Sequence, residues 1–316
     1  MRDSQALAWL LEPENPSSRY LALTRLLGRP ADDPEVQAAQ TAIPAHDPAR
    51  SLLAAQWPEG YWMRPDSSYS PKHKATVWQV IFLAALGAPR LEALERACAH
   101  LLEHSRLPDG RFAEKQAAQG AVACLNGNLV RAMIQLGVQD PRLDASVEAL
   151  AEMVARDGFR CRYNAPKPAP ARMREGLPCA WGAIKALGAF AEVPAVHRSA
   201  AVQAAIERGI TLLSEGNLAT GAYPTATRPS SLWRSFGFPL GFSSDLLEAL
   251  EVLGALGAPQ APDFEAAVAV VRRHQDGSGR WTLEYTPRNT WAEFGTMGQP
   301  NKWVTFRALQ ALASWE

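Results

Sequence analysis

The chain lacks the short motifs on which several large enzyme classes depend. Its 316 residues contain no glycine-rich phosphate loop, no Gly-x-Ser-x-Gly nucleophile elbow and no His-Glu-x-x-His zinc motif. The first motif cradles nucleotide phosphates, the second exposes a nucleophilic serine, and the third places two zinc-binding histidines on one helical face. The sequence therefore gives no support to the common nucleotide-binding and hydrolase classes.

Net charge, cysteine and long apolar runs are also scarce. The 32 basic residues balance 32 acidic ones, so no overall field attracts nucleic acid or an anionic membrane. The opening residues are too acidic and their apolar stretch too short for a secretory signal, so we expect a cytoplasmic protein whose four cysteines are reduced. The best apolar run, residues 76–88, is well short of a membrane span, so we do not expect an integral membrane protein.

A long internal period is present instead. The pattern Gln-x-x-x-Gly-x-Trp is complete at residues 56–62 and 275–281. Three partial copies place glycines at 110, 158 and 221, so that successive glycines lie 50, 48, 63 and 58 residues apart. Each copy precedes an apolar helical run, and a period of this length accommodates two helices with their connections. The pattern predicts a helical repeat protein.

The repeated motif has a structural interpretation. A glycine after a polar turn takes positive φ and ends the preceding helix. The aromatic ring two residues later then packs back on the helix end, and a side chain such as Gln56 or Gln275 bonds the turn backbone. We therefore expect these rings to join one repeat to the next rather than to bind ligand.

Two sets of helices alternate along the chain. The set before each turn is amphipathic, which predicts an outer layer, and the set after it is apolar nearly all round, which predicts helices covered on both sides. The outer set is expected at about 48–55, 90–104, 140–155, 198–213 and 262–274, and the inner set at about 73–87, 120–137, 179–191, 241–257 and 301–315. With residues 1–47 as a sixth helical pair beside the five repeats of 48–316, the prediction is a single all-α domain, an α/α toroid.

Repeats of this form resemble the terpenoid cyclase and protein prenyltransferase superfamily, with its squalene cyclase-type Gln-x-x-x-Gly-x-Trp turns, over residues 48–316. The resemblance implies a central cavity that relatives use for isoprenoid diphosphates or polyenes. The Asp-x-Asp-Asp motif with which class II cyclases protonate an alkene is missing, because Asp32-Asp33 has no upstream partner. Squalene-type cyclisation is therefore not expected.

The connections that enter the inner helices are basic. They must all lie at one mouth of the toroid, and they carry 14 basic against 5 acidic residues. Such residues beside helix N-termini bind phosphate or carboxylate, although a solvated rim is the simpler alternative. The candidates for an anionic head group are Lys72, Lys74, Arg172, Arg174 and Lys302, and the rings expected to line an apolar cavity are Tyr69, Trp78, Trp181, Trp233 and Trp303.

Cysteines mark the start of two inner helices. Cys124 and Cys179 share the spacing Cys-x-x-Gly, and Cys161 lies in the connection between those repeats. Adjacent inner helices are about 10 Å apart, so three thiolates with one open position are a candidate zinc site. The resemblance implies zinc-activated thiolate chemistry as well, because protein prenyltransferases place a catalytic zinc in this fold. The alternative is that buried cysteines serve as small apolar residues.

Asp245 and His73 are the remaining candidates for chemistry. Both lie at the start of an inner helix, where each is a fourth zinc ligand or a catalytic acid or base, although an aspartate there is also a natural helix cap. The leading hypothesis is a prenyltransferase-like or cyclase-like enzyme acting on an isoprenoid or other apolar chain with an anionic head. The alternatives are a noncatalytic toroid that binds a lipid or a peptide, and a structural scaffold.

Overall fold

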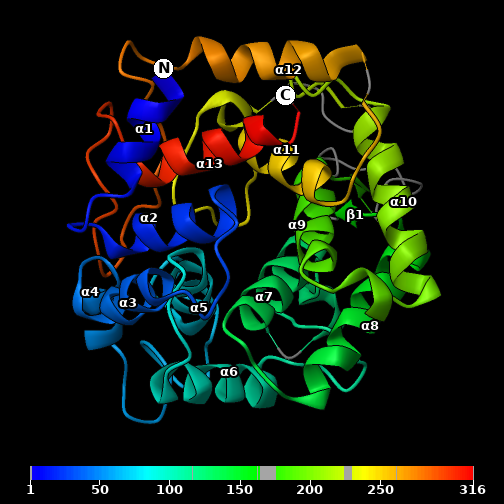
Figure 1. Cartoon of the computed structure of the whole chain (residues 1–316). Helices are drawn as coiled ribbons and strands as arrows, with labels where there is room; N and C mark the ends of the chain where they lie inside the picture. Colours follow the sequence, from blue (N-terminus) through cyan, green and yellow to red (C-terminus); the bar gives the residue numbers. More distant parts are fainter. Residues whose placement is uncertain are drawn as a thin grey trace.

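The computed structural model describes residues 2–115, 117–161, 163, 176–223, 230–260 and 262–315. Helices form two concentric layers, which confirms the predicted all-α toroid (Figure 1). The outer helices are α1 (Arg2–Leu10), α3 (Pro34–Ala42), α4 (Ala49–Ala54), α6 (Glu92–His104), α8 (Pro141–Asp157), α10 (Ala200–Ser214) and α12 (Pro262–Arg273). The inner helices are α2 (Pro16–Leu21), which continues as the π-helical turn η1 (Ala22–Leu26), α5 (Thr76–Ala85), α7 (Ala123–Gln135), α9 (Ala180–Ala191), α11 (Leu246–Ala255) and α13 (Lys302–Ala313).

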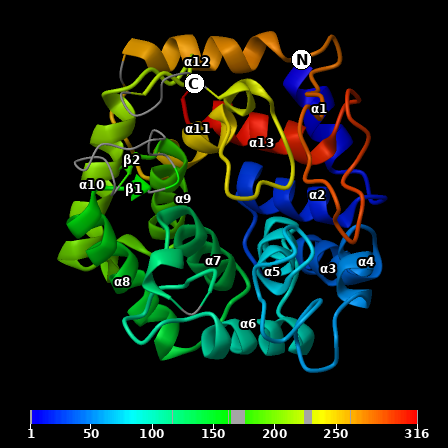
Figure 2. The same ribbon diagram turned by 180° about the vertical axis from the view of Figure 1, so that it is seen from behind.

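Short elements complete the described chain. The 3-10 turns are η2 (Ile43–Ala45), η3 (Ala118–Gly120), η6 (Ala195–His197) and η7 (Ser231–Arg234). A small antiparallel ladder joins β1 (Arg160–Cys161) to β2 (Leu177–Pro178) at the start of α9, as Figure 2 shows from behind. None of the described helices combines the length and the apolar character that crossing a bilayer requires.

The inner ring closes through α2. Helices α5, α7, α9, α11 and α13 pack in that order, each on the next. The Ser17 hydroxyl on α2 then bridges the two ends of the series, because it donates to the Leu86 carbonyl after α5 at 2.7 Å and accepts from the Trp303 indole of α13 at 2.8 Å. In the resulting six-membered ring α2 lies opposite α9, as Figures 1 and 2 agree.

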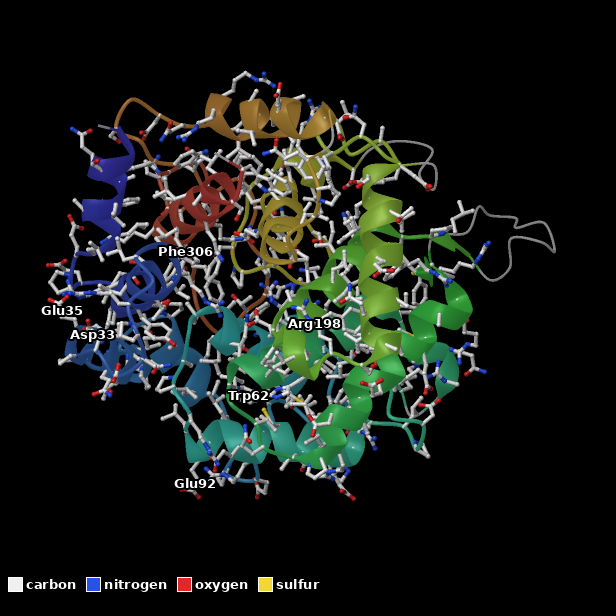
Figure 3. All side chains as sticks on the ribbon, turned by 45° about the vertical axis from the view of Figure 1, so that its right-hand side comes forward. Asp33, Glu35, Trp62, Glu92, Arg198 and Phe306 are labelled. Atoms are coloured by element: carbon white, nitrogen blue, oxygen red, sulfur yellow. The ribbon has the colours of Figure 1, made fainter. Side chains whose placement is uncertain are left out.

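The burial pattern follows the hydropathy of the two helix sets. Every residue from Thr76 to Ala84 on α5 is buried, whereas α6 buries only one face. In Figure 3, Glu92 and Glu35 point outward from the outer layer and Phe306 lies among the inner helices. Burial of apolar surface on both sides of the inner ring is thus the main stabilising contribution to the fold.

The Gly-aromatic turns have the expected geometry. The glycines of all five copies have positive φ, between 59° and 96°. In the two complete copies the indoles of Trp62 and Trp281 donate to carbonyls of the preceding outer helix, each at 2.8 Å, and Gln56 bonds the turn carbonyl of Gly60 at 3.1 Å. The backbone N–H of each tryptophan also donates to a threonine hydroxyl at the following inner helix. The motif therefore ties the two helices of a pair together.

Two long connections cover one end of the ring. The segments before α11 and before α13 are joined by the Phe238 N–H, which donates to the Tyr285 carbonyl at 3.1 Å. The Phe238 ring stacks on Trp303 with centroids 5.1 Å apart. We call this side, where the inner helices begin, the loop end. The opposite side carries the short connections from inner to outer helices.

Helices α7 and α9 approach more closely than a side chain at their contact allows. A Cβ added to Gly127 on α7 would lie 2.3 Å from the backbone carbon of Lys185 on α9. A contact of that length requires the two helices to move apart, so glycine is required at this point of the ring.

Gly127→Ala should destabilise the protein by about 3 kcal/mol, because overpacking forces backbone shifts in a close-packed interior. Urea unfolding measures the loss. The matched control is Gly277→Ala, where the added methyl meets nothing within 4 Å. Similar losses in both variants would show that the α7–α9 contact is not the cause.

Candidate functional site in the central cavity

A cavity of about 170 Å³ lies inside the inner ring. All six inner helices contribute to its wall, and two residues of a long connection, Phe238 and Leu240, line it from the loop end. Its lining includes the exposed Arg25 and the partly exposed Gln135 and Gln310, all near the ends of their helices. These residues place an opening of the cavity on the side of the short connections.

An ion pair joins α11 to α13 beside the cavity. Arg307 of α13 donates to both carboxylate oxygens of Asp245 at 2.8 Å, and also to the Gly237 carbonyl at 2.8 Å. Asp245 caps α11, since it accepts from the Glu248 N–H at 2.9 Å, and it accepts from the Gly237 N–H at 3.2 Å. The Asp245 side chain is thus fully engaged, and it does not line the cavity. This geometry is that of a group that positions Arg307.

A second buried pair joins α9 to α11. The Lys185 ammonium lies 2.7 Å from a carboxylate oxygen of Glu248, and these side chains are only 2% and 6% exposed. Arg131 of α7 lies 3.5 Å from the other oxygen of Glu248. Burial lowers the pKa of Lys185, while the neighbouring Glu248 opposes the fall. Both residues of this pair line the cavity.

Glu251 is the carboxyl of the cavity wall whose pKa is raised toward neutrality. Its Oε1 atom lies 3.3 Å from Nε of Arg307, in an ion pair that does not have hydrogen-bond geometry. Burial raises the pKa of Glu251 to about 7, and the nearby carboxylates of Asp245 and Glu248 add to the rise, while Arg307 and Arg131 oppose it. A buried carboxyl with a pKa near neutrality exchanges a proton readily at physiological pH.

A third group of contacts lies at the cavity entrance. Glu192, at the end of α9, accepts from the Gln135 amide at 2.7 Å and lies 3.3 Å from Arg131. Its other oxygen lies 3.6 Å from Arg25 of η1. Burial raises the pKa of Glu192, but the two arginines outweigh it and hold the pKa below its ordinary value.

Several residues expected from the sequence to bind substrate meet at the loop end. The rings of Tyr69 and Trp78 lie 5.0 Å apart, and those of His73 and Trp78 lie 5.2 Å apart. The Lys72 ammonium lies 3.6 Å from the centre of the Phe242 ring, and the Trp181 ring lies 6.1 Å from the same ring. None of these residues lines the central cavity. Burial raises the pKa of Tyr69 and lowers those of Lys72 and His73.

The three cysteines also meet at the loop end. Cys161 of β1 interacts with Cys179 through a side-chain hydrogen bond, which together with burial raises the pKa of Cys179. Burial raises the pKa of Cys124 to about 11, with a further contribution from Cys161. In the part of the chain that the structure describes, however, no three His, Cys, Asp or Glu side chains are arranged to hold a metal ion. The zinc site therefore stays a prediction from the sequence, and we derive no chemical step through a metal.

The remaining predicted residues are dispersed. Trp233 donates to the Leu218 carbonyl at 2.6 Å, Lys302 pairs with Glu12 at 2.8 Å, and the Lys74 ammonium lies over the Trp291 ring. Trp303 is buried against Phe238. These contacts are structural, and none of the four residues lines the cavity. Arg172 and Arg174 lie outside the described residues.

The sequence analysis missed the charged residues of the cavity. Lys185, Glu248, Glu251 and Arg307 each occur on a helix whose other residues are almost all apolar and buried. A charge on a helix covered from both sides is costly unless it is paired or serves a function. That conflict between charge and burial is the signal that identifies these residues from the sequence.

Comparisons with known proteins bear on the fold. No protein-family model matches the chain, and neither does any curated protein. Among solved structures, a glycosidase is 12% identical, with 84% of this chain and 95% of that chain covered and a TM-score of 0.39. A variant of the type II terpene cyclase MstE from Scytonema, in complex with merosterolic acid A, is 14% identical, with 84% and 94% covered and a TM-score of 0.33. At these identities and TM-scores the likeness assigns neither a family nor an activity to this chain, and the α/α toroid rests on the arrangement of its own helices.

Proposed function

We propose that this toroid is an enzyme that binds a short apolar molecule with an anionic head group in its central cavity and transfers a proton through Glu251. The observation that carries the proposal is the Glu251 carboxyl, which lines the cavity, lies 3.3 Å from Arg307 and has its pKa raised by burial to about 7. General acids and bases work best when their pKa lies near the operating pH.

The size of the cavity favours a compact ligand. Its volume of about 170 Å³ is below the roughly 300–1,000 Å³ of typical ligand pockets. Ile81, Phe238 and Phe306 supply an apolar wall. A five-carbon prenyl group suits this space better than a long polyene, which narrows the isoprenoid hypothesis drawn from the sequence.

The charges of the cavity favour an anion when Glu251 is protonated. The four cations Arg25, Arg131, Lys185 and Arg307 then face the three carboxylates of Asp245, Glu192 and Glu248, so one positive charge is left uncompensated. An anionic head group compensates that charge, and its binding therefore favours the protonated, acidic form of Glu251. This electrostatic balance therefore couples binding of the anion to protonation of Glu251.

Zinc at Cys124, Cys161 and Cys179 stays a prediction from the sequence. Elemental analysis of protein purified without a metal-binding tag tests it. About one zinc per chain, lost in Cys161→Ser, supports a metal centre at the loop end. Zinc well below one per chain returns the three thiols to the role of small packing residues.

A noncatalytic binder is the second candidate, favoured by the extent to which the cavity charges are already paired. Glu251→Gln separates the two functions. The glutamine retains the shape and the neutral charge of the protonated acid, so a binder keeps its affinity for the ligand. An enzyme that uses Glu251 keeps the affinity but loses about 10²–10⁴-fold in turnover.

Ligand binding should depend on the free space inside the ring. Dimethylallyl diphosphate at 100 times its dissociation constant should raise the melting temperature by about 4 °C, whereas farnesyl diphosphate should have a smaller effect. Ala85→Phe fills the cavity from α5 and should abolish the shift. Ala54→Phe, on the exposed face of α4, is the matched control and should leave it unchanged. An equal shift in both variants would place the binding elsewhere.

Glu251→Gln should also flatten the pH dependence of stability. The folded protein holds the Glu251 proton up to about pH 7, whereas the ordinary pKa of the side chain is 4.5. The folded state therefore binds more protons within this window, and the stability of the wild type falls as the pH rises through it. The variant should match the wild type near pH 4.5 and exceed it by about 3 kcal/mol above pH 7. Urea unfolding at both pH values gives the difference, and parallel pH profiles would contradict the raised pKa.

A further inference from the structure

We infer that Arg25, Arg131 and Gln135 form an oxyanion-binding subsite at the cavity entrance, and that the carboxylate of Glu192 occupies this subsite until a ligand replaces it. The ligand class is a carboxylate or a phosphoryl group. The inference rests on the proposed function, because it assigns the place of the anionic head group, but its test requires neither turnover nor Glu251.

The subsite joins opposite sides of the ring. Arg25 lies on η1, which continues α2, while Glu192 follows α9 on the far side (Figure 1). The 3.6 Å contact between Arg25 and Glu192 therefore spans the entrance. Arg131 and Gln135, one turn apart on α7, approach the other carboxylate oxygen at 3.3 and 2.7 Å. Two guanidinium groups and an amide thus converge on one oxyanion.

The three donors face the cavity, whereas their acceptor does not. Arg25, Arg131 and Gln135 all line the cavity wall, and Glu192 is not among the lining residues. Arg131 also continues inward, with Glu248 at 3.5 Å. An anion bound to these donors therefore reaches the buried charges directly. Guanidinium groups suit such a site because their planar donors match carboxylate and phosphate oxygens.

Replacement of Glu192 is energetically feasible. The Arg25 side chain is 49% exposed and that of Glu192 is 14% exposed, so the contact between them contributes little net stability, and a bound anion regains the contacts with Arg131 and Gln135 that Glu192 gives up. Glu192 follows the last turn of α9, so rotation of its side chain toward solvent needs no change in the helix. While Glu192 occupies the donors, only a fraction of the molecules can bind an external anion, which weakens the apparent affinity by that fraction.

Titration of inorganic phosphate into the full chain, followed by calorimetry, tests the subsite. Glu192→Gln removes the competing charge and should bind phosphate at least about tenfold more tightly than the wild type. Glu103→Gln changes the net charge equally at an exposed pair with Arg142 on the outer surface, and it should bind like the wild type. Adding Arg25→Met to Glu192→Gln should cancel most of the gain.

The result that overturns the inference is a Glu192→Gln variant with wild-type phosphate affinity, a gain that Glu103→Gln reproduces, or a gain that survives Arg25→Met. Glu192→Asp provides a second route if the glutamine variant does not fold, because its shorter carboxylate retracts from Arg25 and should give an intermediate gain. If these titrations fail but Ala85→Phe still abolishes the shift in melting temperature, only the subsite is contradicted. If the phosphate titrations succeed but no prenyl diphosphate binds, the proposed function is contradicted and the subsite is not.

Discussion

The ion pair between Arg307 and Asp245 is the interaction on which the rest of the site depends. It joins two inner helices, and both partners also bond the backbone of Gly237, which anchors the connection that covers the loop end. Arg307 also neutralises part of the charge of Glu251. Removing one partner of such a buried pair costs about 3–5 kcal/mol, because it leaves the other charge uncompensated. This one contact therefore holds in place the connection that covers the loop end, two helices of the inner ring and the Glu251 carboxyl.

The cavity wall is more highly charged than the rest of the core. Most inner-ring side chains are apolar and fully buried, yet the cavity is lined by four cationic and two acidic side chains, and the carboxylates of Asp245 and Glu192 pair with these cations from outside the lining. Such a network is held in place by its own geometry and by the low dielectric around it. Its balance changes by one charge when Glu251 gains a proton, so the network responds to pH and to a charged ligand through the same group.

The two ends of the toroid have different roles in this interpretation. The loop end holds the cysteines and a cluster of rings around Phe242, and it is covered by long connections. The opposite end has short connections and bears Arg25 and Glu192 over the cavity. The basic rim of loops that composition predicts belongs to the loop end, and its part in binding an anion stays a prediction. The entrance is marked by individual charges near the ends of the inner helices.

The sequence by itself determined the helical repeat, the two layers and the Gly-aromatic turns, because these depend on residues close together in the chain and on hydropathy within one helix. Gly60 and Trp62 show this, since the glycine conformation and the indole bond both lie within ten residues. Only the tertiary structure decided the site. Asp245 and Arg307 lie 62 residues apart in the chain, and Arg25 and Glu192 lie on helices at opposite sides of the ring. Ring closure brings these partners together, and no local pattern records which charges will face each other.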